Sequence, residues 1–429
     1  MKKYLTFIAA AIMATACQNE DSVTGQLQTG DPIKFSVAER GITRAPGEVN
    51  TEAELAKTGF GVFGCYTGKL TYENTTVSSD FMYNQLVMAA EEVASDQQPQ
   101  AEPSYSWFYN PVKYWPNTQE LDKGYLMEYV SFFAYAPYES EPREGSKTGI
   151  IDISKNYDKG DPWVNFRLPD YPWGQGEEGD EDYIEPQQVD LMYGVKKLNE
   201  TQEGAIDDQL FIDEQKPYED KENGDPADPR TDDLKFHFRH ALACFGDKIT
   251  IRLGEDVNTI VKDYATIVVT KLTITYKNLC TKGRLVLNSP NGPNWKEIIS
   301  GELTTERTFV KKNAPLPLTL STEAQILSEG DGLLFIPMVV KGCEEPYAEI
   351  TIDYTITLPG KDGATETKQG TATTTINLMD KAKAGMKEPI AFTVTRNLDL
   401  LHIIYQLPES SDPDEQSKAD GPSWSREIK

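Results

Sequence analysis

Apolar and polar residues alternate along much of the chain, and this alternation is the clearest structural signal in the sequence. A period of two places every second side chain on the same face of a β-strand. In the stretch IVVTKLTITYK (267–277) it predicts a strand whose apolar face is formed by Val268, Leu272, Ile274 and Tyr276. Val269 falls on the opposite face with Lys271 and two threonines. One buried and one wet face is typical of an antiparallel sheet.

The same alternation recurs in EITIDYTITL (349–358), PIAFTVT (389–395) and DKITIRL (247–253). Turn sequences rich in Gly and Pro, such as LPGKDG and SPNGPN, separate such runs. Many short strands joined by turns predict an all-β protein built from antiparallel β-sandwiches. A helix is expected only in NTEAELAKTG, with Asn50 as its N-terminal cap and Gly59 as its stop.

Two acidic segments without a strand pattern interrupt the alternation, at 174–188 and 213–233. The second is the better linker candidate, because long strands resume at Leu234. The expected organisation is an N-terminal β-sandwich domain over 45–230, a C-terminal one over 231–407 and a loose acidic tail over 408–429.

The N-terminus predicts export. MKK is a short basic region, and YLTFIAAAIMATA is an apolar stretch too short to span a bilayer as a mature helix. Small residues directly before Cys17 resemble a bacterial lipoprotein signal peptide over 1–16, in which the cysteine is acylated and becomes the mature N-terminus. The acidic QNEDS that follows resembles the surface-export signal of lipoproteins in the Bacteroides group. The alternative is an ordinary secretory signal with an incidental cysteine.

The charge balance narrows the class of partner. The chain has 429 residues and a formal net charge of −26. Phosphates would repel such a protein, which argues against nucleic acid and against adhesion to anionic lipid. The lipid on Cys17 would then be the membrane anchor.

A short strand precedes the expected first domain. In PIKFSVA (32–38), Ile33, Phe35 and Val37 fall on one face, and Lys34 and Ser36 fall on the other. This pattern predicts a half-buried strand. The stretch GITRAPGE follows, in which an arginine lies in a Pro/Gly turn. Taken alone, the composition of this stretch favours a plain N-terminal edge strand followed by a surface arginine.

Catalytic and metal-binding motifs are missing from the sequence. GxSxG, P-loop, HExxH and dinucleotide-binding patterns do not occur. His240 lies on the apolar face of LKFHFRH and is interpreted as a core histidine. The segments DKGDPW (158–163) and NGDPADPRTDD (223–233) carry oxygen ligands without the spacing of a calcium loop. We therefore expect no enzyme activity, no catalytic residue, no cofactor and no metal.

Two sets of residues leave alternatives open. Four cysteines outside the signal form either two disulfides or buried free thiols, and their spacing does not decide between these; they are Cys65, Cys244, Cys280 and Cys343. An aromatic cluster is either hairpin core or a sugar-stacking platform, with core packing favoured; it comprises Trp107, Tyr109, Tyr114, Trp115, Phe132, Phe133 and Tyr135.

Several stretches together resemble the fimbrillin-like proteins, the subunits of type V pili in the Bacteroides group. The most specific is NPVKYWPN followed by VSFFAYAPY and then FRHALA. PIKFSVAERGITRA, FGVFGCY, FMYNQLV, VDLMYGV, GRLVL and LLFIPM add to the resemblance in the order of the family.

The resemblance implies two transthyretin-like β-sandwich domains in tandem and proteolytic maturation at an arginine. Carried onto this chain, it implies cleavage between Arg44 and Ala45 of a propeptide over 17–44. The removed strand, with Ile33, Phe35 and Val37, would be a placeholder. A strand from another pilus subunit would then fill its groove by β-augmentation.

The function implied is a structural subunit or adhesin of a surface fimbria, exported as an outer-membrane lipoprotein. A glycan-binding surface lipoprotein is the alternative; it would keep residues 18–44 and display an exposed aromatic row. An enzyme of carbohydrate breakdown is disfavoured, because no catalytic constellation is visible.

Overall fold

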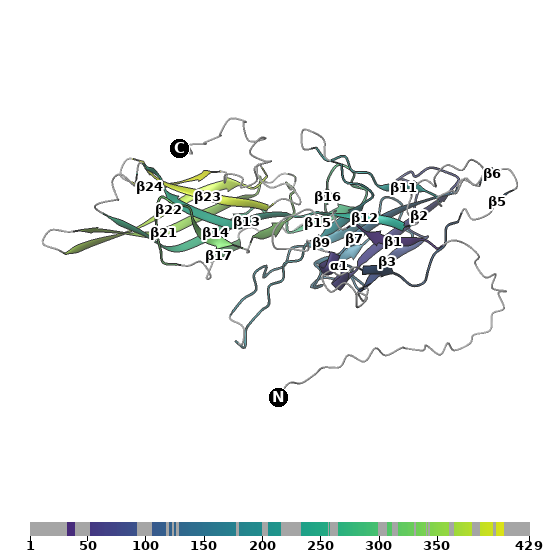
Figure 1. The fold of residues 1–429 in the computed structure, drawn as a ribbon, viewed down its shortest axis with the longest axis horizontal. Coiled ribbons are helices and arrows are strands. Elements are labelled where there is room, and N and C mark those ends of the chain that lie inside the picture. The colour runs from purple at the N-terminus through teal and green to yellow at the C-terminus, as the bar shows by residue number, and fades with distance from the viewer. Residues whose placement is uncertain are drawn as a thin grey trace, which may run out of the picture.

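The computed structural model is an elongated molecule of two β-rich bodies arranged along its long axis (Figure 1). It describes residues 32–38, 52–91, 105–116, 120–121, 124–125, 128–176, 180–199, 205–215, 233–255, 257, 265–298, 307–310, 316–329, 332–339, 341, 344–359, 364–379, 387–397 and 400–406. Within these ranges strands predominate, which confirms the all-β prediction.

An eight-stranded sheet forms most of the first body. Its order is β1-β12-β10-β7-β2-β3-β4, and β11 pairs with β7 beside this path. The strands are β1 Lys34–Val37, β2 Phe60–Gly68, β3 Met82–Glu91, β4 Tyr105–Phe108, β7 Tyr129–Ala136, β10 Met192–Val195, β11 Phe211–Glu214 and β12 Asp233–His240. All neighbours are antiparallel except β1, which runs parallel to β12.

This sheet curls on itself, so that its first and last strands, β1 and β4, lie side by side. One face encloses a core of its own, which includes Phe60, Phe132, Phe236 and Phe238. A closed or nearly closed sheet leaves few unpaired edges.

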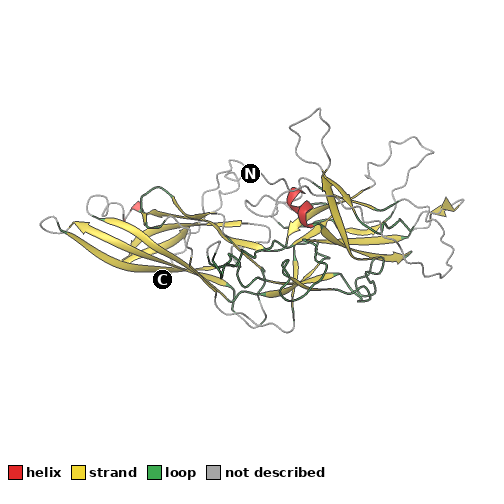
Figure 2. Ribbon diagram, turned by 90° about the horizontal axis from the view of Figure 1, so that it is seen from below, coloured by secondary structure: helices red, strands yellow, loops and turns green. Residues whose placement is uncertain are grey.

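The helix α1 (Glu52–Thr58) covers part of this body and appears as the red coil in Figure 2. It contributes Leu55 to the core, and Gly59 ends it as expected. Gly59 has φ +66° and donates its N–H to the carbonyl of Leu55 at 2.8 Å. A Cβ at this position would lie 2.6 Å from the carbonyl oxygen of Val87. Only glycine meets both conditions without strain.

A four-stranded sheet joins parts of the chain that are distant in sequence. Its order is β16-β15-β9-β8. The strands are β8 Ile150–Ile153, β9 Trp163–Arg167, β15 Lys282–Val286 and β16 Asn294–Glu297. Strands from both sides of the expected 230/231 boundary therefore pair in one sheet, and β12, which follows that boundary, belongs to the first body.

The second body is formed by two five-stranded sheets. One has the order β19-β13-β23-β24 with β20 on β13, and the other has the order β17-β14-β21-β22 with β18 on β14. The strands are β13 Ala243–Leu253, β14 Thr266–Lys277, β17 Arg307–Val310, β18 Leu318–Thr319, β19 Gln325–Glu329, β20 Leu333–Phe335, β21 Tyr347–Pro359, β22 Thr365–Asn377, β23 Lys387–Asn397 and β24 Leu400–Gln406. The small pair β5 (Glu120–Leu121) and β6 (Gly124–Tyr125) stands apart from both bodies' sheets.

One predicted face of β14 is wrong. Leu272, Ile274 and Tyr276 are buried as expected, but Val269 is buried and Val268 is not. The register with β21 shifts between Val269 and Lys271. This irregularity acts as a β-bulge: the odd-numbered position Val269 is buried before it, and the even-numbered positions from Leu272 onward are buried after it.

The two bodies share a continuous buried core. β12 ends at His240 and β13 begins at Ala243, and the two residues that connect them, Ala241 and Leu242, are both buried. At this junction the indole N–H of Trp295 donates to the carbonyl of Ala241 at 2.9 Å. No helix among the described residues has the length and hydropathy needed to cross a bilayer.

Candidate functional site: the first strand and its slot

β1 occupies a slot between β12 and the segment that follows β4. On one side it pairs in register with β12, from Lys34 opposite Asp233 to Val37 opposite Phe236. On the other side the N–H of Ile33 donates to the carbonyl of Lys113 at 2.9 Å, and Pro32 forms an antiparallel bridge with Tyr114. β1 is therefore paired with β12 along its length, and on the other side the chain has backbone neighbours at Pro32 and Ile33, directly before the strand.

The apolar face of β1 lies in the core of the first body. Ile33, Phe35 and Val37 are 1%, 3% and 5% exposed. The ring of Phe35 lies 5.3 Å from that of Tyr109, 5.8 Å from that of Phe132 and 6.0 Å from that of Phe236. These rings come from three different parts of the sheet, so β1 completes a core that the rest of the sheet leaves open.

Tyr109 is the polar contact that fixes the start of β1. Its hydroxyl donates to the carbonyl of Ile33 at 2.8 Å and accepts from the N–H of Lys113 at 3.1 Å. Burial raises the pKa of Tyr109 to about 12, so the phenol remains a neutral donor at physiological pH. The sequence placed Tyr109 in an aromatic cluster but did not predict its bond to Ile33.

The other face of β1 fits its surroundings less well. Lys34 is exposed, and the hydroxyl oxygen of Ser36 is buried without a hydrogen-bond partner among the described residues. A buried hydroxyl without a partner costs roughly 1–3 kcal/mol. β1 is thus well packed on its apolar side and imperfectly satisfied on its polar side.

Several residues predicted to act at this end of the chain lie outside the described residues. They are Cys17, Arg44 and Ala45, and the tail over 408–429 is outside as well. The described part of the chain resumes with α1, so the predicted cut falls between β1 and the rest of its own body.

The aromatic cluster is mainly core. Tyr109, Trp115, Phe132, Phe133 and Tyr135 are buried, while Trp107 and Tyr114 are half-buried. Core packing was the favoured prediction for this cluster, and the burial of these rings confirms it.

The cysteines and His240 are also internal. Cys65 and Cys280 are buried free thiols, and Cys244 is buried; Cys343 lies outside the described residues. Burial raises the pKa of Cys65 to about 12 and that of Cys280 to about 11. His240 is buried beside the carboxylate of Asp190, which fits the interpretation as a core histidine.

Of the two calcium candidates, only the segment 158–163 lies wholly within the described residues, and its Asp161 carboxylate already accepts hydrogen bonds from the protein. The carboxylate of Asp161 accepts from the Tyr72 hydroxyl at 2.7 Å and from the side-chain amide of Asn288 at 2.9 Å. Among the described residues no group of three or more acidic, histidine or cysteine side chains is placed to hold a metal ion.

Comparison with known proteins gives a partial sequence match and a broader match of fold. The fimbrium subunit Fim1C of Phocaeicola vulgatus is 26% identical over 168 residues, which is 39% of this chain and 38% of that protein. The match thus spans well under half the length of this curated relative. No family model matches the sequence.

A crystal structure of a fimbrial protein from Bacteroides vulgatus has a TM-score of 0.53 with this chain. The superposition covers 88% of this chain and 98% of that one at 21% identity, so it is a likeness of fold. The sequence match to a fimbrial subunit and the fold shared with a fimbrial protein together confirm that this chain resembles the fimbrillin-like family.

Proposed function

We propose that the protein is a structural, non-enzymatic subunit or adhesin of a surface fimbria, and that β1 is a temporary strand in its slot. The observation that carries the proposal is the position of β1. It is paired with β12, and Pro32 and Ile33 directly before it bind the segment after β4. Its three apolar side chains lie in the core, and it is joined to its own body through the segment that contains Arg44. The names of the similar proteins support a role in fimbriae.

Export and anchoring come first in the proposed sequence of events. The signal over 1–16 directs the chain out of the cytoplasm, and acylation of Cys17 holds the precursor in the outer membrane. β1 keeps the first body closed during this passage. Without it, the backbone groups of β12 that face β1 would be unpaired, and exposed edges of this kind promote aggregation.

Loss of β1 would create a strong site for another strand. Burial of a large apolar side chain stabilises by roughly 1.5–3 kcal/mol, so three such side chains represent about 4.5–9 kcal/mol. The empty slot would also expose the unpaired edge of β12. A strand from another subunit with a similar apolar alternation would restore both the packing and the backbone pairing.

Cleavage after Arg44 makes this exchange possible and severs the body from the lipid on Cys17. An arginine flanked by Gly and Pro, with Ala45 directly after it, suits an arginine-specific protease. The mature subunit would then be held in the fimbria by its neighbours.

The test uses two arginines in the same segment. Arg44→Ala in the native host should leave the protein full-length, labelled by a fatty-acid analogue through Cys17, and absent from SDS-resistant ladders. Arg40→Ala is the matched control and should be processed normally. Wild-type surface protein should begin at Ala45 on N-terminal sequencing.

A wild-type protein that begins at Cys17, together with an Arg44→Ala variant that behaves identically, would contradict the placeholder role. Such a protein would be an uncleaved anchor or the glycan-binding lipoprotein considered above.

A further inference from the structure

Both backbone groups of Ile33, directly before β1, are bound by the slot. Its N–H donates to the carbonyl of Lys113 at 2.9 Å, and its carbonyl accepts from the hydroxyl of Tyr109 at 2.8 Å. The N–H of Lys113 donates to the same hydroxyl at 3.1 Å, which closes a ring of three hydrogen bonds. We call this ring the backbone grip. It uses no side chain of the strand, so any residue other than proline can take the place of Ile33 in it.

A pocket of aromatic rings receives the next inward side chain, Phe35. The rings of Tyr109, Phe132 and Phe236 have their centres 5.3, 5.8 and 6.0 Å from that of Phe35. Phe132 meets Phe35 edge-on, with the ring planes at 77°, and Phe236 stacks on it, with the planes at 26°. Both arrangements are favourable for aromatic pairs at this separation. These three rings, which we call the ring pocket, therefore match a planar side chain.

The ring pocket is held in place by contacts that do not involve β1. The ring of Phe236 lies 4.8 Å from that of Phe211 and 5.9 Å from that of Phe60. The ring of Phe132 lies 5.9 Å from that of Trp115. Other side chains thus support the walls of the pocket, and we expect the pocket to persist when the strand is replaced.

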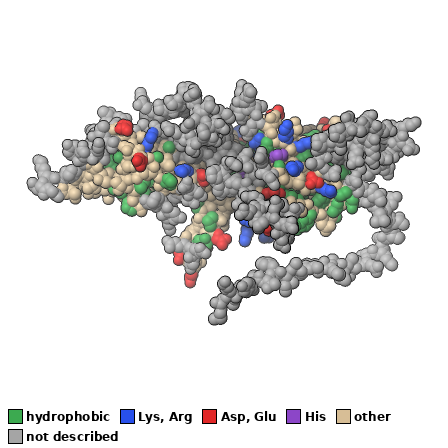
Figure 3. Space-filling view, in the orientation of Figure 1, with side chains coloured by type: hydrophobic (Ala, Val, Ile, Leu, Met, Phe, Trp, Pro, Cys, Tyr) green, Lys and Arg blue, Asp and Glu red, His purple; other side chains and the backbone are tan. Residues whose placement is uncertain are grey.

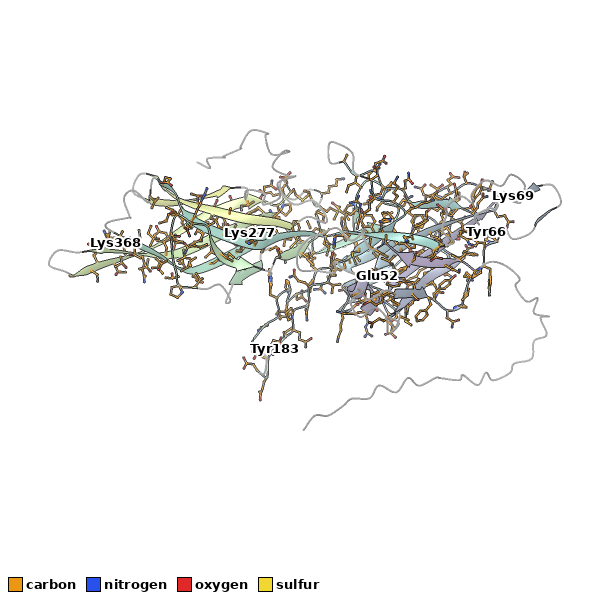
Figure 4. The ribbon with its side chains drawn as sticks, in the orientation of Figure 1. Glu52, Tyr66, Lys69, Tyr183, Lys277 and Lys368 are labelled. Carbon is orange, nitrogen blue, oxygen red and sulfur yellow. The ribbon has the colours of Figure 1, made fainter. Side chains whose placement is uncertain are left out.

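The helix α1 adds to this support. The ring of Trp107 lies 5.2 Å from that of Phe60, and its indole N–H donates to the carboxylate of Glu52 at 2.8 Å. Glu52 is the first residue of α1 and is labelled on the first body in Figure 4. A hydrogen bond as well as apolar packing therefore fixes the rings behind the pocket.

An incoming strand could enter the slot in more than one register. A slip by one residue would turn its inward side chains away from the core. A slip by two residues keeps the inward face and can form the backbone grip again, so only the pockets for the inward side chains distinguish that register. The face in Figure 3 shows hydrophobic, basic and acidic side chains intermixed over the first body, so it presents no single chemistry that could select a strand instead.

We propose that the slot selects a strand with an aromatic residue at the middle of three inward positions, because Tyr109 holds the backbone of the first position and the ring pocket reads the second. The inference rests on the proposed strand exchange. It adds the chemistry of the strand that the slot accepts, whichever subunit supplies it.

The test compares peptides of equal composition. Full-length protein is cut after Arg44 with an arginine-specific protease, and uptake of a labelled peptide in place of β1 is measured. The reference peptide is DPIKFSVA, the sequence of residues 31–38, and DPFKISVA exchanges Ile33 and Phe35.

DPFKISVA should bind at least about tenfold more weakly. In the native register it leaves the ring pocket to an isoleucine, and a shift by two residues would bury its aspartate in the place of Ile33. The control peptide DPIAFSVA replaces only the exposed Lys34 and should bind as the reference does.

Tyr109→Phe tests the backbone grip separately, because it keeps the ring and removes the hydroxyl. It should weaken the binding of DPIKFSVA and of DPFKISVA by the same factor, about fivefold to tenfold, and leave the ratio of the two affinities unchanged. Tyr114→Phe is the matched control. Tyr114 meets the strand through its backbone, in the bridge to Pro32, so this variant should bind both peptides as wild type does.

Equal binding of DPIKFSVA and DPFKISVA would overturn selection by the ring pocket, and unchanged binding by Tyr109→Phe would overturn the backbone grip. The uncut protein gives a second measurement that needs no exchange. In it, Ile33→Phe combined with Phe35→Ile should lower the urea midpoint, whereas Lys34→Ala should not, and equal midpoints would also contradict the ring pocket. Failure of cut wild type to take up DPIKFSVA would count instead against the proposed strand exchange.

Discussion

At the scale of one residue, Ser36 explains how β1 can be well packed in the core and still be replaced by another strand. Its neighbours Phe35 and Val37 are almost fully buried in the core, while its own hydroxyl oxygen is buried without a partner among the described residues. A strand carrying a small apolar residue at this position would keep the packing and avoid the unsatisfied oxygen. The unsatisfied hydroxyl of Ser36 therefore favours replacement of β1 by such a strand over the reverse exchange.

Ser36→Ala should stabilise the precursor by about 1 kcal/mol, because it removes a buried hydroxyl that lacks a partner. The same substitution should slow replacement of β1 by a labelled DPIKFSVA peptide. The measurements are the urea midpoint and the exchange rate of the protease-treated protein.

Ser131→Ala is the control of opposite sign. Its hydroxyl accepts from the N–H of Asp213 at 3.0 Å in a fully buried setting, so its loss should destabilise the protein. If Ser36→Ala destabilises as much as Ser131→Ala does, the hydroxyl of Ser36 has a partner and the explanation is wrong.

The buried thiols predict a loss of stability at alkaline pH. Burial raises the pKa of Cys65 from 9.0 to about 12 and that of Cys280 from 9.0 to about 11. Between pH 9 and these values the folded chain keeps protons that the unfolded chain releases, so stability falls as pH rises. The expected slope is about 1.4 kcal/mol per pH unit for each thiol.

Urea unfolding between pH 7.5 and 10.5 measures this slope. Cys65→Ala should reduce it above pH 9 and leave the pH dependence below pH 8 unchanged. An identical slope in the variant would show that Cys65 is not the group responsible.

At the scale of the element, α1 ends at Gly59, where two separate conditions require a glycine. Gly59 needs a positive φ, and its missing Cβ leaves room for the carbonyl of Val87. Gly59→Ala should destabilise the protein by more than the roughly 1 kcal/mol typical of a left-handed alanine, because a backbone clash adds to the strain.

Gly145→Ala separates the two effects. Gly145 also has a positive φ, of +78°, but a Cβ there meets nothing within 4 Å. Its substitution should therefore show the conformational cost alone in a thermal or urea melt. Equal losses for Gly59→Ala and Gly145→Ala would mean that the contact with Val87 relaxes freely.

Alternation was sufficient to predict individual strands and insufficient to predict their partners. The buried faces of β1 and of the C-terminal half of β14 follow directly from the alternation of side chains, because the alternation is a local property of the strand. Nothing in the sequence around Thr270 marks the register shift there. The strict alternation therefore predicted that Val268 is buried, whereas the structure buries Val269. The bond from Tyr109 to Ile33 joins positions 76 residues apart, which no periodicity encodes. For the same reason the slot was expected as a groove but its walls were not identified.

At the scale of the whole molecule, the expected boundary at 230/231 divides paired strands. β12 lies after it but belongs to the first sheet, and β15, which also lies after it, pairs with β9 on one side and with β16 on the other. A fragment over 45–230 would lack these strands and expose the core faces that they cover. With a DPIKFSVA peptide added to both fragments in place of β1, this fragment should fail to give a cooperative thermal transition, whereas a longer fragment over 45–298 retains these strands and should approach native structure in that body.

Circular dichroism and amide NMR dispersion distinguish the two fragments. A well-dispersed, cooperatively melting 45–230 fragment would support the boundary drawn from the sequence and would mean that the cross-boundary sheet contributes little to folding of the first body.

The passage of β12 through Ala241 and Leu242 into β13 has a mechanical consequence. Both strands run along the long axis of the molecule in Figure 1, and both are flanked by hydrogen-bonded neighbours. Backbone hydrogen bonds in antiparallel sheets lie perpendicular to the strands, so a pull along the axis loads many of them at once in shear instead of opening them one by one. A subunit built this way transmits tension from end to end through a continuous chain segment, and we expect the two bodies to yield together under force instead of separating at a hinge.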